Sequence, residues 1–349
     1  MYRMILNETS YFGAGCREAI ATEAGRRGFT KAFFVTDKDL IRFHVADKVV
    51  EVFEKAGIPY EIYSDVKANP TIANVQNGVA AFKASGADFI VALGGGSSID
   101  TAKGIGIVVN NPEFADVRSL EGVANTHHKA VPTFALPTTA GTAAEVTINY
   151  VIIDEAATKK MVCVDPNDIP SVAIVDPELM YSMPKGLTAA TGMDALTHSV
   201  EAYIGNSTTI DTRRDALKAV KLIFENIDIA YEHGDNIQAR RNMLHASFYA
   251  GCAFTKSYVG YVHAVAHSLG GKYNIPHGLA NATILPMVLE DYGSTIYKKL
   301  YQLAVCAGIA DESDDHAVAA DKFISAIKDM KEYFQIGDTF SEIQKEDIP

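Results

Sequence analysis

Residues 88–108, DFIVALGGGSSIDTAKGIGIV, decide the fold, because they read as a buried strand, a glycine triplet and a helix. An apolar run that ends in glycines before a helical pattern is typical of a βα unit on a parallel sheet. The same alternation runs from residue 31 to about residue 136. The sequence therefore predicts an N-terminal α/β domain with a parallel sheet. Its expected strands are 31–37, 60–65 and 131–139, and its expected helices are 48–57 and 75–85.

The second half of the chain has a different pattern. The segments 148–154, 160–165 and 171–176 extend the β-rich region to about residue 176. After residue 183, apolar residues recur at helical spacing with few strand signals. These helical segments are 187–204, 212–231, 238–254 and 261–273. We therefore expect two domains, an α/β domain over residues 1–180 and an all-α domain over residues 181–349.

Length and composition agree with this division. A chain of 349 residues is long for one domain, and 48% hydrophobic residues suffice for two cores. The net charge of −12 makes nucleic acids and anionic membranes poor partners. The N-terminus lacks a signal-peptide pattern, and no apolar run approaches the roughly 20 residues that a membrane span needs. With four scattered cysteines and no disulfide framework, a cytoplasmic location is expected.

The glycine triplet is the first candidate binding site. Glycines let backbone N–H groups approach a ligand, and a helix N-terminus attracts phosphate or pyrophosphate. Ser97 and Asp100 also match a capping box, in which the serine caps the helix and no ligand is involved. The triplet, which is not a GxGxxG fingerprint, leaves both interpretations open.

Two further segments favour a dinucleotide. Asp37 ends the strand 31–37, where a carboxylate could accept hydrogen bonds from ribose hydroxyls and would repel the extra phosphate of NADP. It could equally start a turn or cap the next helix. The segment 136–147, LPTTAGTAAEVT, collects hydroxyls and small residues after another strand. It could admit a ring or phosphate, or simply begin a helix.

The second candidate site is a group of histidines with an aspartate. Asp194 and His198 are four residues apart on an expected helix, and His263 and His267 repeat that spacing. His277 follows a turn that contains glycine and proline. One carboxylate and several neutral imidazoles suit Fe(II), Zn(II), Mn(II) or Co(II). A single histidine in an apolar helix is more often a core residue, but two spaced pairs favour a metal site.

A metal ion and a nicotinamide would together support one reaction, hydride transfer between an alcohol carbon and the nicotinamide ring.

The segments GGGSSIDTAK (94–103) and PTTAGTAAEVT (137–147), with the aspartate and histidine arrangement, carry a family resemblance. Over essentially the whole chain the sequence resembles the iron-containing, group III alcohol dehydrogenases. The resemblance implies a fold like that of dehydroquinate synthase, a Rossmann-like parallel sheet followed by a helical domain. It also implies a homodimer.

The resemblance further implies cofactors and roles for individual residues. NAD(H) and Fe(II) are the implied cofactors, with Zn(II) as a possible substitute. Asp194, His198, His263 and His277 are implied to hold the ion, and His267 to assist proton transfer or substrate placement beside it. Asn149 and Phe254 are implied to line the substrate pocket. The residues implied to hold the dinucleotide are Asp37, Asn69, Gly95, Gly96, Ser97, Thr138, Thr139, Thr142, Asn149 and Lys160.

Within that family, four segments look closest to the members that interconvert lactaldehyde and 1,2-propanediol. These segments are 3–15, 110–122, 138–152 and 162–170. The alternatives are a glycerol or butanol dehydrogenase, a lyase like dehydroquinate synthase, or a shortened, non-catalytic form. Such a lyase needs a Lys and Arg cluster for a substrate phosphate, which the segments with the metal ligands lack. Because relatives continue beyond the equivalent of residue 349, the helical domain is expected to lack its last helices.

Overall fold

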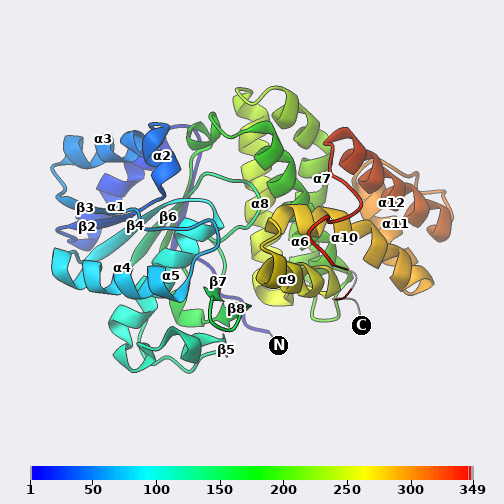
Figure 1. Cartoon of the computed structure of the whole chain (residues 1–349). Coiled ribbons are helices and arrows are strands. Elements are labelled where there is room, and N and C mark those ends of the chain that lie inside the picture. Colours follow the sequence, from blue (N-terminus) through cyan, green and yellow to red (C-terminus); the bar gives the residue numbers. More distant parts are fainter. Residues whose placement is uncertain (1, 345, 347–349) are drawn as a thin grey trace. The chain divides into compact units, whose positions relative to one another are not determined.

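The computed structural model describes residues 2–344 and 346, and it divides into two compact units, Met1–Met183 and Pro184–Pro349. All the strands among the described residues belong to the first unit, and the second unit is helical (Figure 1). The predicted combination of an α/β region with a parallel sheet and an all-α region is confirmed. None of the helices among the described residues has the length and apolar character that a membrane crossing requires.

The first unit is built on a six-stranded sheet in which every pair of neighbouring strands is parallel. Its four inner strands are buried along their whole length, as expected where both faces of a parallel sheet are covered. In spatial order the strands are β1 (Thr9–Phe12), β9 (Val172–Val175), β6 (Thr133–Pro137), β4 (Phe89–Gly94), β2 (Ala32–Val35) and β3 (Tyr60–Tyr63).

Alternate residues of each strand enter two different cores. Phe34 and Val91 pack on one face of the sheet with helices α1 (Ala19–Arg27) and α3 (Asp47–Ala56). Phe33, Ile90 and Ala92 pack on the other face with α4 (Ile72–Ser85) and α5 (Gly96–Asn110) (Figure 1). The short helix α2 (Lys38–Arg42) follows β2. This alternation follows from the two-residue repeat of a strand.

A hairpin outside the main sheet packs on α5. Strands β7 (Asn149–Asp154) and β8 (Lys159–Val164) pair antiparallel, and β5 (Gly122–Val123) adds to β8. The buried ammonium group of Lys103 donates to the Thr147 and Asn149 carbonyl oxygens, at 2.7 and 2.9 Å. Asp100 Oδ2 accepts a hydrogen bond from the Val151 backbone N–H at 3.0 Å. Helix α5 therefore fixes the start of the hairpin.

The capping-box interpretation of the glycine loop is wrong. Gly95 takes the N-cap position of α5, and Ser97 lies inside the helix. Its hydroxyl donates instead to the Ala68 carbonyl oxygen at 2.5 Å, while Asp100 binds the hairpin. The helix-entry interpretation of segment 136–147 is also wrong, because this segment contains no helix after β6. Both segments therefore begin at the carboxyl ends of strands without the caps that were expected of them.

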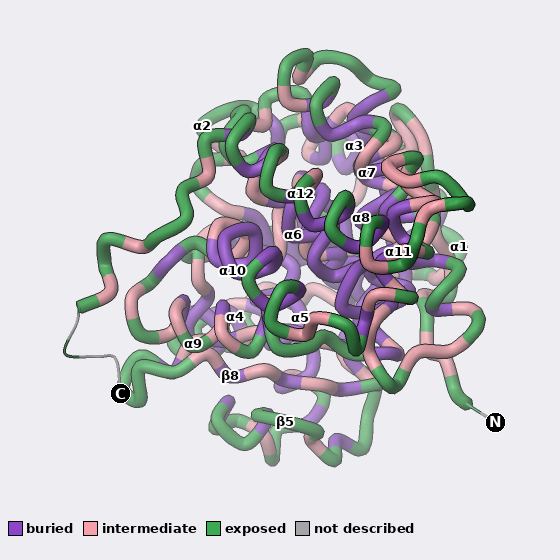
Figure 2. The backbone as a smooth tube through the Cα atoms, turned by 90° about the vertical axis from the view of Figure 1, so that its right-hand side faces the viewer, coloured by how far each residue is buried: buried purple, intermediate pink, exposed green. Residues whose placement is uncertain are grey.

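The second unit is a bundle around one buried helix, α6 (Lys185–Ile204). Fifteen of its 20 residues are buried, so its path is drawn largely in purple in Figure 2. A helix that is buried on every side needs neighbours all round. Helices α7 (Ile210–Glu232), α8 (Ile237–Ser257) and α10 (His277–Tyr292) pack against it. The remaining helices are α9 (Tyr261–Tyr273), α11 (Tyr297–Cys306) and α12 (His316–Tyr333).

Candidate metal centre and dinucleotide site

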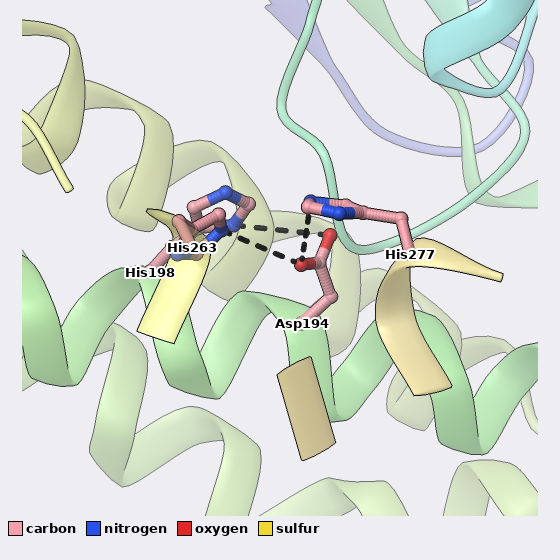
Figure 3. A group of neighbouring side chains, drawn as sticks. All are labelled: Asp194, His198, His263 and His277. Atoms are coloured by element: carbon pink, nitrogen blue, oxygen red, sulfur yellow. Dashed lines mark ion pairs between the residues drawn. The ribbon is translucent and has the colours of Figure 1, made fainter. Parts of the chain in front are cut away.

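The buried helix α6 carries two potential metal ligands one turn apart. Asp194 and His198 leave the same face of the helix because they are four residues apart. His263 of α9 and His277, the first residue of α10, face them (Figure 3). Potential ligand atoms of these four side chains all lie within 4.8 Å of one another. The structure therefore brings together the four residues that the sequence proposed as ligands.

Asp194 lies at the centre of this group. Its Oδ1 is 3.8 Å from His263 Nε2 and 3.6 Å from His277 Nε2, and its Oδ2 is 3.9 Å from His198 Nδ1 (Figure 3). Burial lowers the pKa of His263 well below its usual value, and the neighbouring histidines lower this pKa further. A neutral imidazole has the free lone pair that a metal ion needs.

Asn281, on α10, shows that the ligand atoms face a common point. Its amide Nδ2 is 2.7 Å from Asp194 Oδ1, 3.0 Å from His263 Nε2 and 3.2 Å from His277 Nε2. One N–H₂ group thus lies among three electron-rich atoms. In addition, the buried Nδ1 of His198 has no hydrogen-bond partner among the described residues. One carboxylate and three imidazoles that converge in this way fit a divalent transition-metal ion.

The position of His277 depends on the glycine that follows it. A Cβ atom on Gly278 would lie 2.4 Å from the Ala190 carbonyl oxygen, in the backbone of α6. Real Cβ atoms do not approach backbone oxygens so closely, so a larger residue would push α10 away from α6. Gly278 therefore allows the start of α10 to bring His277 to the ligand group.

Aromatic rings pack around the ligands. Phe254 of α8 stacks on His198, with ring centroids 4.1 Å apart, and His198 stacks on His263 at 4.3 Å. His267 is half-buried, and its ring lies 5.0 Å from that of His277. It is outside the group of four, although it is adjacent to it. The geometry thus places both Phe254 and His267 beside the candidate metal position.

Sequence reasoning missed one buried carboxylate, Glu201. Its Oε2 is 2.6 Å from His263 Nδ1, on the side of the ring away from Asp194. Burial raises the pKa of Glu201, and hydrogen bonds from backbone N–H groups partly offset this rise. The signal was present, because Glu201 follows Asp194 and His198 on the same helical face at the spacing i, i+4, i+7.

Most of the proposed dinucleotide residues lie at the carboxyl ends of neighbouring strands. The glycine loop follows β4 and the threonine loop follows β6, its neighbour in the sheet. A Cβ atom on Gly95 would lie 3.2 Å from the Thr139 side chain, and one on Gly96 would lie 2.9 Å from that of Thr142. Thr138 donates its backbone N–H to the Gly94 oxygen at 2.9 Å. Ligands of open α/β sheets bind at this edge.

The other dinucleotide candidates surround this edge less closely. Asp37 follows β2 and caps α2, because its Oδ1 accepts the Leu40 backbone N–H at 2.8 Å. Asn69 is half-buried in the loop that leads to α4, next to the residue that Ser97 binds. On the hairpin, Asn149 pairs with Val164 and Lys160 with Ile153. These two residues therefore lie at different positions along the hairpin. Burial raises the pKa of the Asp100 carboxyl group to about 6, and the positive charges of Lys103 and Lys160 offset part of this rise.

Two family models divide the chain between them. Residues 7–177 match the model of the iron-containing alcohol dehydrogenases, and residues 188–349 match the C-terminal model of the same family. The chain belongs to the iron-containing alcohol dehydrogenase family. As an iron-containing alcohol dehydrogenase it is an oxidoreductase, and it carries the Asp and His group described above.

Individual members of the iron-containing alcohol dehydrogenase family are similar over almost the whole chain. Lactaldehyde reductase of Escherichia coli K12 is 45% identical over 99% of this chain and 91% of its own length. A crystal structure of 1,3-propanediol oxidoreductase is 38% identical, with a TM-score of 0.93 over 97% of this chain and 88% of that one. Sulfoacetaldehyde reductase of Bifidobacterium kashiwanohense, solved in complex with NAD⁺, is 28% identical, with a TM-score of 0.88 over 99% and 90%.

Proposed function

We propose that the protein is an NAD-dependent, iron-assisted alcohol dehydrogenase that interconverts lactaldehyde and 1,2-propanediol. The convergence of Asp194, His198, His263 and His277 carries this proposal, and the 45% identity to a lactaldehyde reductase supports the substrate. When bound, Fe(II) supplies a positive charge that lowers the pKa of an alcohol oxygen, and NAD supplies the ring that exchanges hydride. Zn(II) suits the same ligands and would compete.

The residues around the four ligands then have separate tasks. His267, adjacent to His277 but outside the ligand group, would hold or release the alcohol proton. Phe254 covers one face of the His198 ring and would limit both water and substrate size there. Asn149, at the start of β7, would contact the substrate or the dinucleotide in the first unit.

The first unit would hold NAD(H) at the strand ends. Gly95 caps a helix of 15 residues that begins with Gly96 and Ser97, and the unpaired N–H groups at this end would bind the pyrophosphate. Asp37 uses Oδ1 as a cap, and its Oδ2 would accept a ribose hydroxyl, which favours NAD over NADP. The supporting contacts would come from Asn69, Thr138, Thr139, Thr142 and Lys160.

The test is NADH oxidation with lactaldehyde after anaerobic purification and separate loading with Fe(II), Zn(II) or no metal. We expect turnover with Fe(II), and loss of turnover in His263→Ala. His233→Ala is the matched control, because His233 is an exposed residue of the same unit outside the ligand group. Absence of turnover with loaded wild-type protein would contradict the proposed reaction.

A second substrate follows from a specific similarity. The 1,3-propanediol oxidoreductase structure superposes with a TM-score of 0.93, so 1,3-propanediol is the comparison substrate. 1,2-Propanediol and 1,3-propanediol are isomers that differ in the position of one hydroxyl group, so the comparison tests where the pocket accepts that group. A higher kcat/KM for 1,3-propanediol than for 1,2-propanediol would transfer the proposal to that diol and leave the metal and NAD assignments intact.

We further propose that the protein is a cytoplasmic homodimer. The four cysteines form no disulfide, which suits a reducing compartment. The homodimer rests on the family resemblance. Strand β1 pairs with β9 of the same chain along its whole length. Light scattering after size-exclusion chromatography should give twice the chain mass of 37.7 kDa. A single-chain mass would contradict the dimer.

A further inference from the structure

Glu201 is a buried carboxylate beside the candidate metal centre but outside its ligand group. It lies three residues after His198 on α6 and is only 3% exposed. A buried carboxylate is costly unless several donors reach it. The question is therefore which donors hold it, and what this fixes at the ligands.

Two hydrogen bonds hold this carboxylate. Its Oε1 accepts the Val262 backbone N–H at 2.7 Å, and backbone N–H groups in the segment 260–263 offset part of the rise in its pKa that burial causes. Its Oε2 is 2.6 Å from His263 Nδ1. An ionised carboxylate only accepts hydrogen bonds, so at this short distance Nδ1 must carry the hydrogen.

The backbone near α9 is shaped for this contact. A Cβ atom on Gly260 would lie 2.8 Å from Glu201 Oε1, so the carboxylate packs where a side chain would otherwise be. Gly260 precedes the first residue of α9, and His263 is the third residue of that helix. The carboxylate therefore binds the start of α9 at both its backbone and its histidine.

We propose that Glu201 is a positioning residue that fixes the tautomer and orientation of His263 so that its Nε2 lone pair faces the metal position. This inference rests on the metal site of the proposed function. The contact on the opposite side of the ring supports the same tautomer. Asn281 Nδ2 lies 3.0 Å from His263 Nε2 as a donor, so Nε2 must carry a lone pair. A carboxylate on the far nitrogen also makes an imidazole ligand more basic.

The choice of variant follows from the surroundings of Glu201. The residue lines a cavity of about 440 Å³ with Ser257, Tyr292 and Lys299, so a truncated side chain would admit water to His263. Glu201→Gln keeps the volume but replaces one acceptor oxygen with an N–H₂ donor. That donor must face either the Val262 N–H or the Nδ1 hydrogen of His263, and the second case favours the tautomer that cannot bind a metal through Nε2.

The test measures Co(II) affinity by chelator competition, together with the visible absorption of the bound Co(II), which reports its ligand geometry. We expect Glu201→Gln to bind Co(II) about 10–100-fold more weakly, with a changed spectrum. Thr197→Val is the matched control. It removes a buried hydroxyl of the same helix, and among the described residues this hydroxyl bonds only to the Met193 carbonyl oxygen. Wild-type affinity and spectrum in Glu201→Gln would overturn the inference.

Gly260→Ala provides a second variant should Glu201→Gln fail to fold. It leaves Glu201 and every ligand in place chemically, but its methyl group would displace the carboxylate. We expect weaker Co(II) binding here as well, and unchanged binding in a folded Gly260→Ala protein would overturn the inference. Failure of the wild-type protein itself to bind Co(II) would instead contradict the proposed metal site and, with it, this role. Binding without turnover of lactaldehyde would contradict only the proposed substrate.

Discussion

The ring of Phe254 lies face to face on the imidazole of His198, with centroids 4.1 Å apart and ring planes 11° from parallel. Phe254 is 5% exposed, so the contact is shielded from solvent. Because His198 has no hydrogen-bond partner at Nδ1 among the described residues, ring packing is the main restraint on its orientation.

Phe254→Ala should therefore affect both stability and metal binding. Removal of a buried phenyl ring lowers the free energy of unfolding by about 3–5 kcal/mol. The His198 ring then gains freedom, and we expect Zn(II) affinity to fall several-fold. Phe323→Ala, in the core of α12, is the control because it removes an equally buried ring away from the ligands. Equal Zn(II) affinities in the two variants would contradict a role for Phe254 in ligand orientation.

Gly278→Ala should weaken metal binding without any change to a ligand. Its methyl group would meet the Ala190 carbonyl oxygen at 2.4 Å, and the strain should lower the free energy of unfolding by about 1–3 kcal/mol. The start of α10, with His277, would shift. Gly186→Ala, at the second residue of α6, is the control, since no atom outside its own part of the helix lies within 4 Å of its new Cβ. The measurement is isothermal titration with Zn(II), and an unchanged Gly278→Ala affinity would contradict the packing argument.

Asn281→Asp should make stability depend more strongly on a metal ion. A second carboxylate would replace the N–H₂ group that lies 2.7 Å from Asp194 Oδ1, so the metal-free protein loses a buried hydrogen bond and about 1–3 kcal/mol. A divalent cation would relieve the repulsion between the two carboxylates. We expect a lower Tm without metal and a larger rise in Tm with Zn(II) than in wild-type protein. A smaller rise would show that Asn281 is not at the convergence of the ligands. Asn206→Asp, at an exposed position of the same unit, tests for the effects of added charge alone.

Helical periodicity paired Asp194 with His198 and His263 with His267, whereas the family resemblance implied that His277 rather than His267 completes the group of four. Because Asp194 and His198 are four residues apart, a helix places them on the same face. The glycine and proline before His277 indicated a turn in the chain. The parallel sheet was predictable for a similar reason, since its inner strands are continuous apolar runs.

Residues that support the ligands from other elements were harder to predict. Asn281 lies four residues after His277, so helical spacing could have placed it beside the ligands, but an asparagine in the apolar segment HGLANATIL did not by its type indicate contact with Asp194. Lys103 is buried and binds the hairpin, a contact that its place near the start of a helix did not indicate. Ser97 satisfied the capping pattern, but the glycine at position 95 took the cap. Such contacts depend on how distant segments pack, which local periodicity does not encode.

The buried carboxyl group of Glu145 should make the stability of the first unit depend on pH. Burial raises its pKa from 4.5 to about 7, although Lys103 offsets part of this rise, and its Oε1 has no hydrogen-bond partner among the described residues. A raised pKa in the folded state means that its stabilising contribution is complete below pH 4.5 and is lost as the pH rises through 7. The shift corresponds to about 3 kcal/mol. In urea unfolding from pH 5 to 8, Glu145→Gln should therefore lose less stability than wild-type protein, whereas Glu54→Gln, at an exposed position, should keep the wild-type slope. Equal slopes in wild-type protein and Glu145→Gln would show that Glu145 does not take up a proton on folding.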